Sequence, residues 1–177
     1  QRGAVEGNAR STGPAITADG RYVVFTSFAS TLFVTGQPPL SVSVVLRWDR
    51  LTGDIVLVSR ATAGEPLLAA RSVRPEISND GNRVVFVYGG SVQTEVALGL
   101  RGVIFCRDVA AGTLTQVSTV SLVEGVDRAQ FHDSPSISGD GATPIGWDTS
   151  PGGGLRKACK FTPAGIVQLP GTAASEA

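Results

Sequence analysis

The sequence predicts an all-β protein built from three tandem, four-stranded antiparallel units. One segment recurs at intervals of about 60 residues, reading PAITADGRYVVFTS from Pro14, PEISNDGNRVVFVY from Pro75 and PSISGDGATPIGWD from Pro135. No stretch of any length places apolar residues at the 3.6-residue period of an amphipathic helix. The repeat therefore sets the architecture, and almost no helix is expected.

The first half of each unit predicts two strands joined by a tight turn. A proline opens the first short strand, where its missing N–H costs least. The second strand is β-branched and aromatic, as in Tyr22 to Thr26 and Arg83 to Tyr88. The turn between them is an Asp-Gly pair, whose aspartate has a structural role because its side chain bonds the following backbone. The three pairs are Asp19-Gly20, Asp80-Gly81 and Asp140-Gly141.

The second half of each unit predicts a third and a fourth strand around another glycine turn. It reads VVLRWDRLTGDIVLVS from Val44, VIFCRDVAAGTLTQVS from Val103 and RKACKFTPAGIVQLPG from Arg156. One repeat domain is expected over 1–177, with units at about 14–60, 75–118 and 135–169. The third unit is expected to be the most irregular, because Pro144 and Gly146 replace a valine and a phenylalanine in its second strand.

The pattern P-x-I-S-x-D-G-R-x-V-x-F-x-S, followed by D-R-x-T-G and V-S, resembles the PD40 (WD40-like) repeat of TolB-like β-propellers of the long-blade bacterial type. The resemblance covers residues 14–169. It implies three propeller blades in tandem, a partial or half propeller, in an extracytoplasmic or secreted protein. The loops before the third strands carry no clustered carboxylates, so no calcium or other metal site is expected.

Three blades predict that this chain has a partner, because known propellers close with about 4 to 8 blades. Two large faces would otherwise stay exposed. Three alternatives remain open: two chains form one six-bladed ring, the chain is part of a longer propeller, or blades of many copies stack into a polymeric array. The expected partner is thus another protein or a second copy of the chain.

Composition and motifs exclude several function classes. Net charge is zero and only 17% of residues are charged, so no nucleic-acid partner is expected, and no apolar run reaches membrane-spanning length. Cys106 and Cys159 align at equivalent positions and are expected to be buried free thiols. There is no nucleophile elbow, P-loop or H-E-x-x-H motif, and His132 is the single histidine, so the chain is expected to be a non-catalytic module without a cofactor.

Two alternatives to a protein-binding or self-assembling module stay open. One is a carbohydrate-binding propeller, which the non-equivalent positions of Trp48 and Trp147 disfavour. The other is the propeller part of a larger extracytoplasmic enzyme. All of these functions are compatible with a propeller, since a fold does not determine its function.

Antiparallel order places all tight turns at one end of the units and all long connections at the other, so binding is expected at the long-loop end. The predicted polar binding residues, which ordinary linker salt bridges and caps would also explain, are Arg10, Arg71, Arg74, Arg128, His132 and Asp133. The predicted partner-contact residues, which would otherwise extend the core, are Phe28, Leu32, Phe33, Leu40, Leu98 and Leu100.

Overall fold

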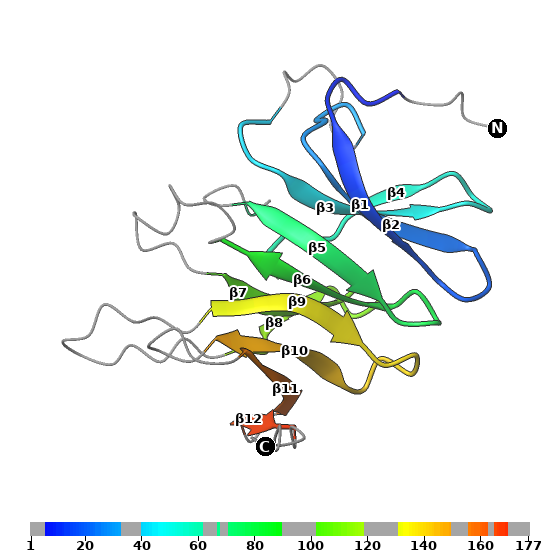
Figure 1. Cartoon of the computed structure of the whole chain (residues 1–177). Coiled ribbons are helices and arrows are strands. Elements are labelled where there is room, and N and C mark those ends of the chain that lie inside the picture. Colours follow the sequence, from blue (N-terminus) through cyan, green and yellow to red (C-terminus); the bar gives the residue numbers. More distant parts are fainter. Residues whose placement is uncertain are drawn as a thin grey trace, which may run out of the picture.

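The computed structural model describes residues 6–32, 40–61, 67, 71–89, 102–118, 131–149, 156–162 and 165–169, and within these ranges every element is a β-strand. The strands form three four-stranded sheets that stack along the chain (Figure 1). The predicted all-β class, with three antiparallel propeller blades in tandem, is confirmed. Blade 1 holds β1 (Ser11–Ile16), β2 (Tyr22–Ser27), β3 (Val44–Asp49) and β4 (Ile55–Leu57). Blade 2 holds β5 (Ser72–Ile77), β6 (Arg83–Tyr88), β7 (Val103–Asp108) and β8 (Thr113–Gln116). Blade 3 holds β9 (Phe131–Ile137), β10 (Pro144–Thr149), β11 (Arg156–Thr162) and β12 (Gly165–Gln168).

Each blade is a meander in which every strand pairs antiparallel with the next one in the chain. Both hairpins of a blade therefore point to the same end, which we call the tight-turn end and which lies at the right in Figure 1. The first strands adjoin one another, because β5 packs against β1 and β9 packs against β5.

The Asp-Gly turn is held by the same hydrogen bonds in all three blades. In blade 2 the Ser78 hydroxyl donates to Asp80 Oδ1 at 2.5 Å and accepts from the Arg83 N–H at 2.9 Å. Asp80 Oδ1 also accepts from the Asn82 N–H at 3.0 Å. Thr17 and Asp19 repeat this arrangement in blade 1, and Ser138 and Asp140 repeat it in blade 3. These aspartates thus have the structural role that the sequence predicts.

A β-bulge interrupts the first strand of each blade just before its proline. Strand β1 begins at Ser11 rather than at Pro14, and its register with β2 shifts between Thr12 and Ala15. The bulge lets the strand continue past a residue that has no N–H to donate. A residue of positive φ lies at the bulge in every blade, namely Gly13 (59°), Arg74 (54°) and Ser134 (47°).

Strand β10 corrects the expectation that blade 3 would be irregular. It pairs along its length with both β9 and β11, although it contains Pro144 and Gly146. Pro144 is the first residue of the strand, a position where a proline is tolerated. Its register shift with β9 is the bulge shared by all three blades.

The core lies between the blades rather than inside any one of them. The first cluster joins Val24, Val45 and Val58 of blade 1 to Ile77, Val84 and Phe86 of blade 2. The second joins Val85, Val87, Ile104 and Cys106 of blade 2 to Cys159 and Phe161 of blade 3. The central strands β6 and β7 of blade 2 are covered by a blade on either side, so their apolar residues run continuously instead of alternating.

The two cysteines are buried and free, as predicted, but they are not at equivalent positions. Cys106 pairs with Val85, whereas Cys159 pairs with Gly146, which is one position further along the repeat. The sequence alignment was shifted because only two residues separate β11 from β12, whereas four separate β7 from β8. The two thiols consequently face each other's blade within one cluster, and burial raises the pKa of Cys106.

Candidate functional site

Repeat equivalence assigns each blade two faces. Pairing across the strands makes Ile16, Val23, Phe25 and Leu46 of blade 1 equivalent to Ile77, Val84, Phe86 and Phe105 of blade 2. In blade 2 these residues pack against the preceding blade. In blade 1 the same face has no other described blade to pack against, so it forms an open sheet face at one end of the stack (Figure 1).

The open face of blade 1 is apolar and accessible. Ile16 is 61% exposed, whereas its equivalent Ile77 is 9% exposed. Phe25 and Trp48 are half-buried, whereas Phe86, the equivalent of Phe25, is fully buried. Val44 and Leu46 on this face are buried already in the single chain, so the accessible part lies toward the tight-turn end. We call Ile16, Val23, Phe25 and Trp48 the blade 1 open face.

Blade 3 presents the complementary face at the other end of the stack. The N–H of Leu169 donates to the Ala158 carbonyl at 2.8 Å, just as Val58 donates to Val45 in blade 1 at 2.9 Å. Leu169 is therefore equivalent to Val58, yet it is 39% exposed where Val58 is fully buried. We call Ile145, Ala158, Lys160 and Leu169 the blade 3 open face; the three partners of Leu169 in this set are half-buried.

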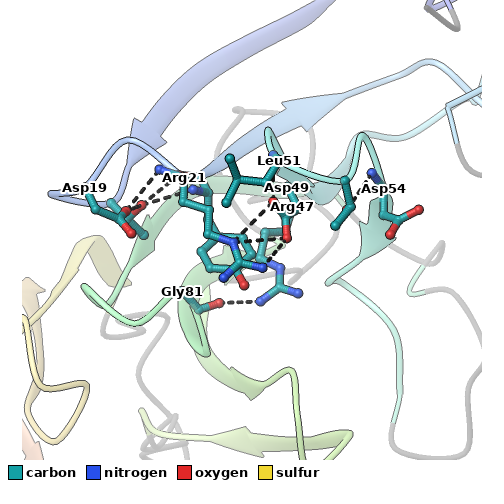
Figure 2. A network of polar contacts seen from close by, with 10 residues as sticks. Asp19, Arg21, Arg47, Asp49, Leu51, Asp54 and Gly81 are labelled. Carbon is teal, nitrogen blue, oxygen red and sulfur yellow. Dashed lines mark hydrogen bonds and ion pairs between the residues drawn. The ribbon is translucent and has the colours of Figure 1, made fainter. Parts of the chain in front are cut away.

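Polar contacts at the tight-turn end lock blade 1 onto blade 2 (Figure 2). Arg47 Nη1 donates to the Gly81 carbonyl in the next blade at 2.5 Å. The Arg47 guanidinium also lies 4.5 Å from the centre of the Tyr22 ring, and Arg21 lies 4.6 Å from the same ring. Burial lowers the pKa of Arg47. Arg21 is in turn paired with Asp49 at 2.9 Å, and its hydrogen bonds hold the pKa of that carboxyl below the usual value.

The space around the glycine of each Asp-Gly turn shows whether a preceding blade covers that turn. A Cβ on Gly81 would clash with the Tyr22 ring of blade 1, and a Cβ on Gly141 would meet Arg83 of blade 2 at 2.8 Å. Tyr22 and Arg83 occupy equivalent positions. A Cβ on Gly20 would meet only Ile16 of its own blade, at 3.9 Å. The first turn of the described chain thus lacks the cover that the other two have.

Two of the predicted binding arginines converge at the long-loop end. Arg10 precedes β1 and Arg71 precedes β5, and both guanidiniums lie over the Phe28 ring, at 5.5 and 5.9 Å from its centre. The Phe28 N–H donates to the Arg10 carbonyl at 3.0 Å and its carbonyl accepts from Leu40 at 2.8 Å. This cluster joins blades 1 and 2 at the start of their first strands.

The other predicted polar residues are not joined to this cluster by the described contacts. Arg74 is exposed at the bulge of β5 with φ 54°. His132 and Asp133 lie in β9, opposite Asp148 and Trp147, and their side chains are outside the described part of the structure. Arg128 is also outside the described residues. A shared polar site of all six residues therefore stays a prediction.

The predicted contact residues divide in the same way. Phe28, Leu32 and Leu40 are half-buried at the long-loop end, and Leu32 Cδ1 lies 3.6 Å from the Cβ position of Gly7. Phe33, Leu98 and Leu100 lie outside the described residues. The sequence predicts two exposed terminal faces, but the candidate contact residues taken from it lie in the loops, although the equivalence of Ile16 with Ile77 was available from the repeat.

Within the described ranges no three His, Cys, Asp or Glu side chains gather as a metal site would require. The same part of the chain contains no helix long and apolar enough to span a membrane.

No protein-family profile matches the chain, and no curated protein matches it either. Solved structures do. A structure from a study of two prolyl endopeptidases is similar with 13% identity and a TM-score of 0.51, over 90% of this chain and 22% of that one. This likeness supports the propeller-like fold and shows nothing further.

Two further solved structures are similar over nearly the whole chain. TolB from Acinetobacter baumannii has 15% identity and a TM-score of 0.42, with 95% of this chain and 45% of TolB covered. A thermostable family-43 glycoside hydrolase has 15% identity and a TM-score of 0.43, with coverages of 96% and 59%. The chain thus spans less than two thirds of the length of each of these three structures.

Proposed function

We propose that this chain is a non-catalytic β-propeller module of the PD40 type that assembles with its own kind through the open faces of its terminal blades. The observation that carries the proposal is the difference in exposure between two equivalent isoleucines. Ile16 is 61% exposed, whereas Ile77 is 9% exposed. Ile77 packs against the preceding blade, whereas Ile16 has no preceding blade among the described residues. The PD40-like repeat also favours an extracytoplasmic setting.

Burial of these faces supports association energetically. Removing apolar surface from water stabilises a complex by about 25 cal/mol per Å² before the costs of association are subtracted. A contiguous apolar sheet face that stays in water is unusual for a soluble protein and marks an interaction surface. Ile16, Val167 and Leu169, three of the exposed large apolar residues, belong to the two terminal blades. All three lie on the open sides of these blades, Val167 because it pairs with Lys160.

A non-catalytic role is favoured by the polar groups of the described chain. The hydroxyl–carboxylate pairs at Thr17, Ser78 and Ser138 are three copies of one turn, so their recurrence has a structural explanation. The half-buried Arg47 and the buried Arg107 donate to backbone carbonyls of a neighbouring blade or of its linker. These contacts hold blades together and leave no described group arranged as nucleophile, base and orienting partner.

Fluorescence of Trp48 tests the proposal directly, because this tryptophan belongs to the blade 1 open face. The chain has two tryptophans, so Trp147→Phe leaves Trp48 as the only one. Iodide quenching of Trp48 is expected to fall several-fold as the protein concentration rises and the face becomes covered. Comparing the solution masses of the unsubstituted chain and of the Trp147→Phe variant checks that this substitution does not itself change assembly.

A matched pair of charge substitutions controls this experiment. Ile16→Glu places a carboxylate on the open face, whereas Leu51→Glu places one on an equally exposed residue in the β3–β4 turn; the two side chains are 61% and 66% exposed. Ile16→Glu should leave Trp48 open to iodide at every concentration, and Leu51→Glu should behave as the parent. If Trp48 of the parent stays fully quenchable at all concentrations, the proposed self-assembly is wrong.

A further inference from the structure

We infer that the blade 1 open face is covered by blade 3 of one second copy, so that two chains close a six-bladed ring about a two-fold axis. The inference rests on the proposed self-assembly and names its partner and geometry. One chain carries both halves of the contact, and a two-fold axis makes the same head-to-tail contact twice, which leaves neither face open. Six blades fall within the range of about 4 to 8 in which propellers close.

The apolar residues of the two open faces match as the internal ones do. Between blades 1 and 2, Val24, Val45 and Val58 share one buried cluster with Ile77, Val84 and Phe86. In blade 3 the positions of these three valines hold Ile145, Ala158 and Leu169. In blade 1 the positions opposite them hold Ile16, Val23 and Phe25. The contact between copies therefore repeats an existing apolar interface with residues of the same class.

Lys160 of blade 3 is placed to donate a hydrogen bond to the Gly20 turn, which no preceding blade covers among the described residues. Lys160 pairs with Ile145 as Arg47 pairs with Val24, so Lys160 occupies the place of the arginine that donates to Gly81. In the ring its ammonium group reaches the Gly20 carbonyl of the second copy, since Gly20 is the equivalent of Gly81. The backbone contact from Asn79 N–H to the Gly139 carbonyl, at 2.8 Å between blades 2 and 3, would be repeated from Gly139 to Ala18 of the copy.

Nothing in the charge of the chain opposes this pairing. Its 15 basic and 15 acidic residues balance, so two copies approach without net repulsion. The Thr143 N–H donates to Ser138 just as the N–H groups of Tyr22 and Arg83 donate to Thr17 and Ser78. Thr143 therefore takes the place of Tyr22 and Arg83, the side chains that cover Gly81 and Gly141. A threonine fits over Gly20 of the copy without a clash but provides less cover. The seam between copies is thus the same kind of interface as the one between blades 1 and 2, with a weaker clamp at its tight-turn end.

Mass in solution tests the ring. Sedimentation equilibrium of the purified chain is expected to reach a plateau at twice 18.2 kDa and to stay there as concentration rises further. Ile16→Glu and Leu169→Glu, on opposite faces, should each shift the dissociation constant at least tenfold toward single chains. Leu51→Glu should not. Circular dichroism of each variant confirms that the blades remain folded.

Mixing the two variants identifies the contact. Ile16→Glu retains an intact blade 3 face and Leu169→Glu retains an intact blade 1 face, so an equimolar mixture should form two-chain species that neither variant forms alone. Mass that keeps growing beyond two chains would overturn the ring in favour of an open array, while the proposed self-assembly would stand. A Leu169→Glu variant that still dimerises would overturn the head-to-tail contact. A single-chain mass with Trp48 open to iodide would overturn the proposed function itself.

Discussion

At the residue scale, alanine substitutions at two glycines distinguish two contributions to stability: backbone strain alone, and backbone strain together with a disturbed contact between blades. Gly53 and Gly81 both have positive φ, at 79° and 73°, but only Gly81 lies against another blade. Gly53→Ala should cost about 1 kcal/mol, because a Cβ in the left-handed region is strained. Gly81→Ala should cost about 2 kcal/mol more, because its Cβ must displace the Tyr22 ring. Urea denaturation of both variants measures the difference; equal losses would show that Tyr22 yields freely.

The aspartates of the Asp-Gly turns make stability depend on acid in a defined direction. The hydrogen bond that Ser78 donates to Asp80 lowers the pKa of this aspartate. The equivalent hydrogen bonds donated by Thr17 and Ser138 lower the pKa values of Asp19 and Asp140. A lowered folded pKa contributes stability above the unfolded value of about 3.9, and that stability is lost as the pH falls through the folded value. The free energy of unfolding should therefore be flat with respect to these groups above about pH 5 and should fall in more acidic solution.

A single substitution isolates this effect. Ser78→Ala removes the first cause of the shift, so the pKa of Asp80 should rise toward its ordinary value. Titration of the Asp80 carboxyl carbon by NMR measures the change, with Asp140 in the same spectrum as an unaltered reference. An unchanged Asp80 pKa would mean that the backbone N–H of Asn82 alone maintains the shift.

At the scale of the element, one serine fastens the fourth strand of a blade to the third. Ser59 Oγ accepts from the buried Val45 N–H at 2.9 Å, and Ser118 Oγ accepts from Ile104 N–H at 2.8 Å. Ser59→Ala should destabilise the chain by about 1 to 3 kcal/mol, because it weakens the bonding of a buried donor. Thermal or urea unfolding tests this, and Ser41→Ala, at an exposed serine, should change stability by less than about 0.5 kcal/mol.

The strands and turns were predictable from the sequence because local chemistry determines them, whereas the bulges were not. A residue of positive φ lies at each bulge, and only Gly13 among the three is of a type that signals this in the sequence; Arg74 and Ser134 adopt the same conformation without such a signal. The register of Cys159 was missed for a related reason, since a glycine turn locates a hairpin without specifying how many residues it contains.

At the scale of the whole molecule, the candidate site is a property of the stack and not of any one motif. The sequence directed attention to apolar loop residues such as Phe28, which the structure places against Arg10 and Arg71. The blade count predicts the two exposed faces, but it does not point to their residues, because Ile16 and Leu169 look like ordinary strand residues. Their significance depends on which blade is missing beside them, and that follows only from the pairing register of all three sheets.

Residues that join blades 1 and 2 can be introduced at the seam between copies, where the equivalent contacts are weaker, to tighten the dimer. In the internal interface Arg47 lies over Tyr22 and donates to Gly81, whereas blade 3 offers Lys160 and Thr143 in those places. The double substitution Thr143→Tyr with Lys160→Arg rebuilds the clamp toward Gly20 of the second copy. A cation–π contact and a charge-assisted hydrogen bond should together contribute about 1 to 2 kcal/mol at each of the two seams. The dimer should therefore gain about 2 to 4 kcal/mol, which lowers its dissociation constant about 30- to 1000-fold. Sedimentation or the protein-concentration dependence of Tm measures the gain. Lys160→Arg alone should yield only part of it, because the guanidinium then lacks its aromatic platform, and a double variant no tighter than the parent would show that the seam does not use this geometry.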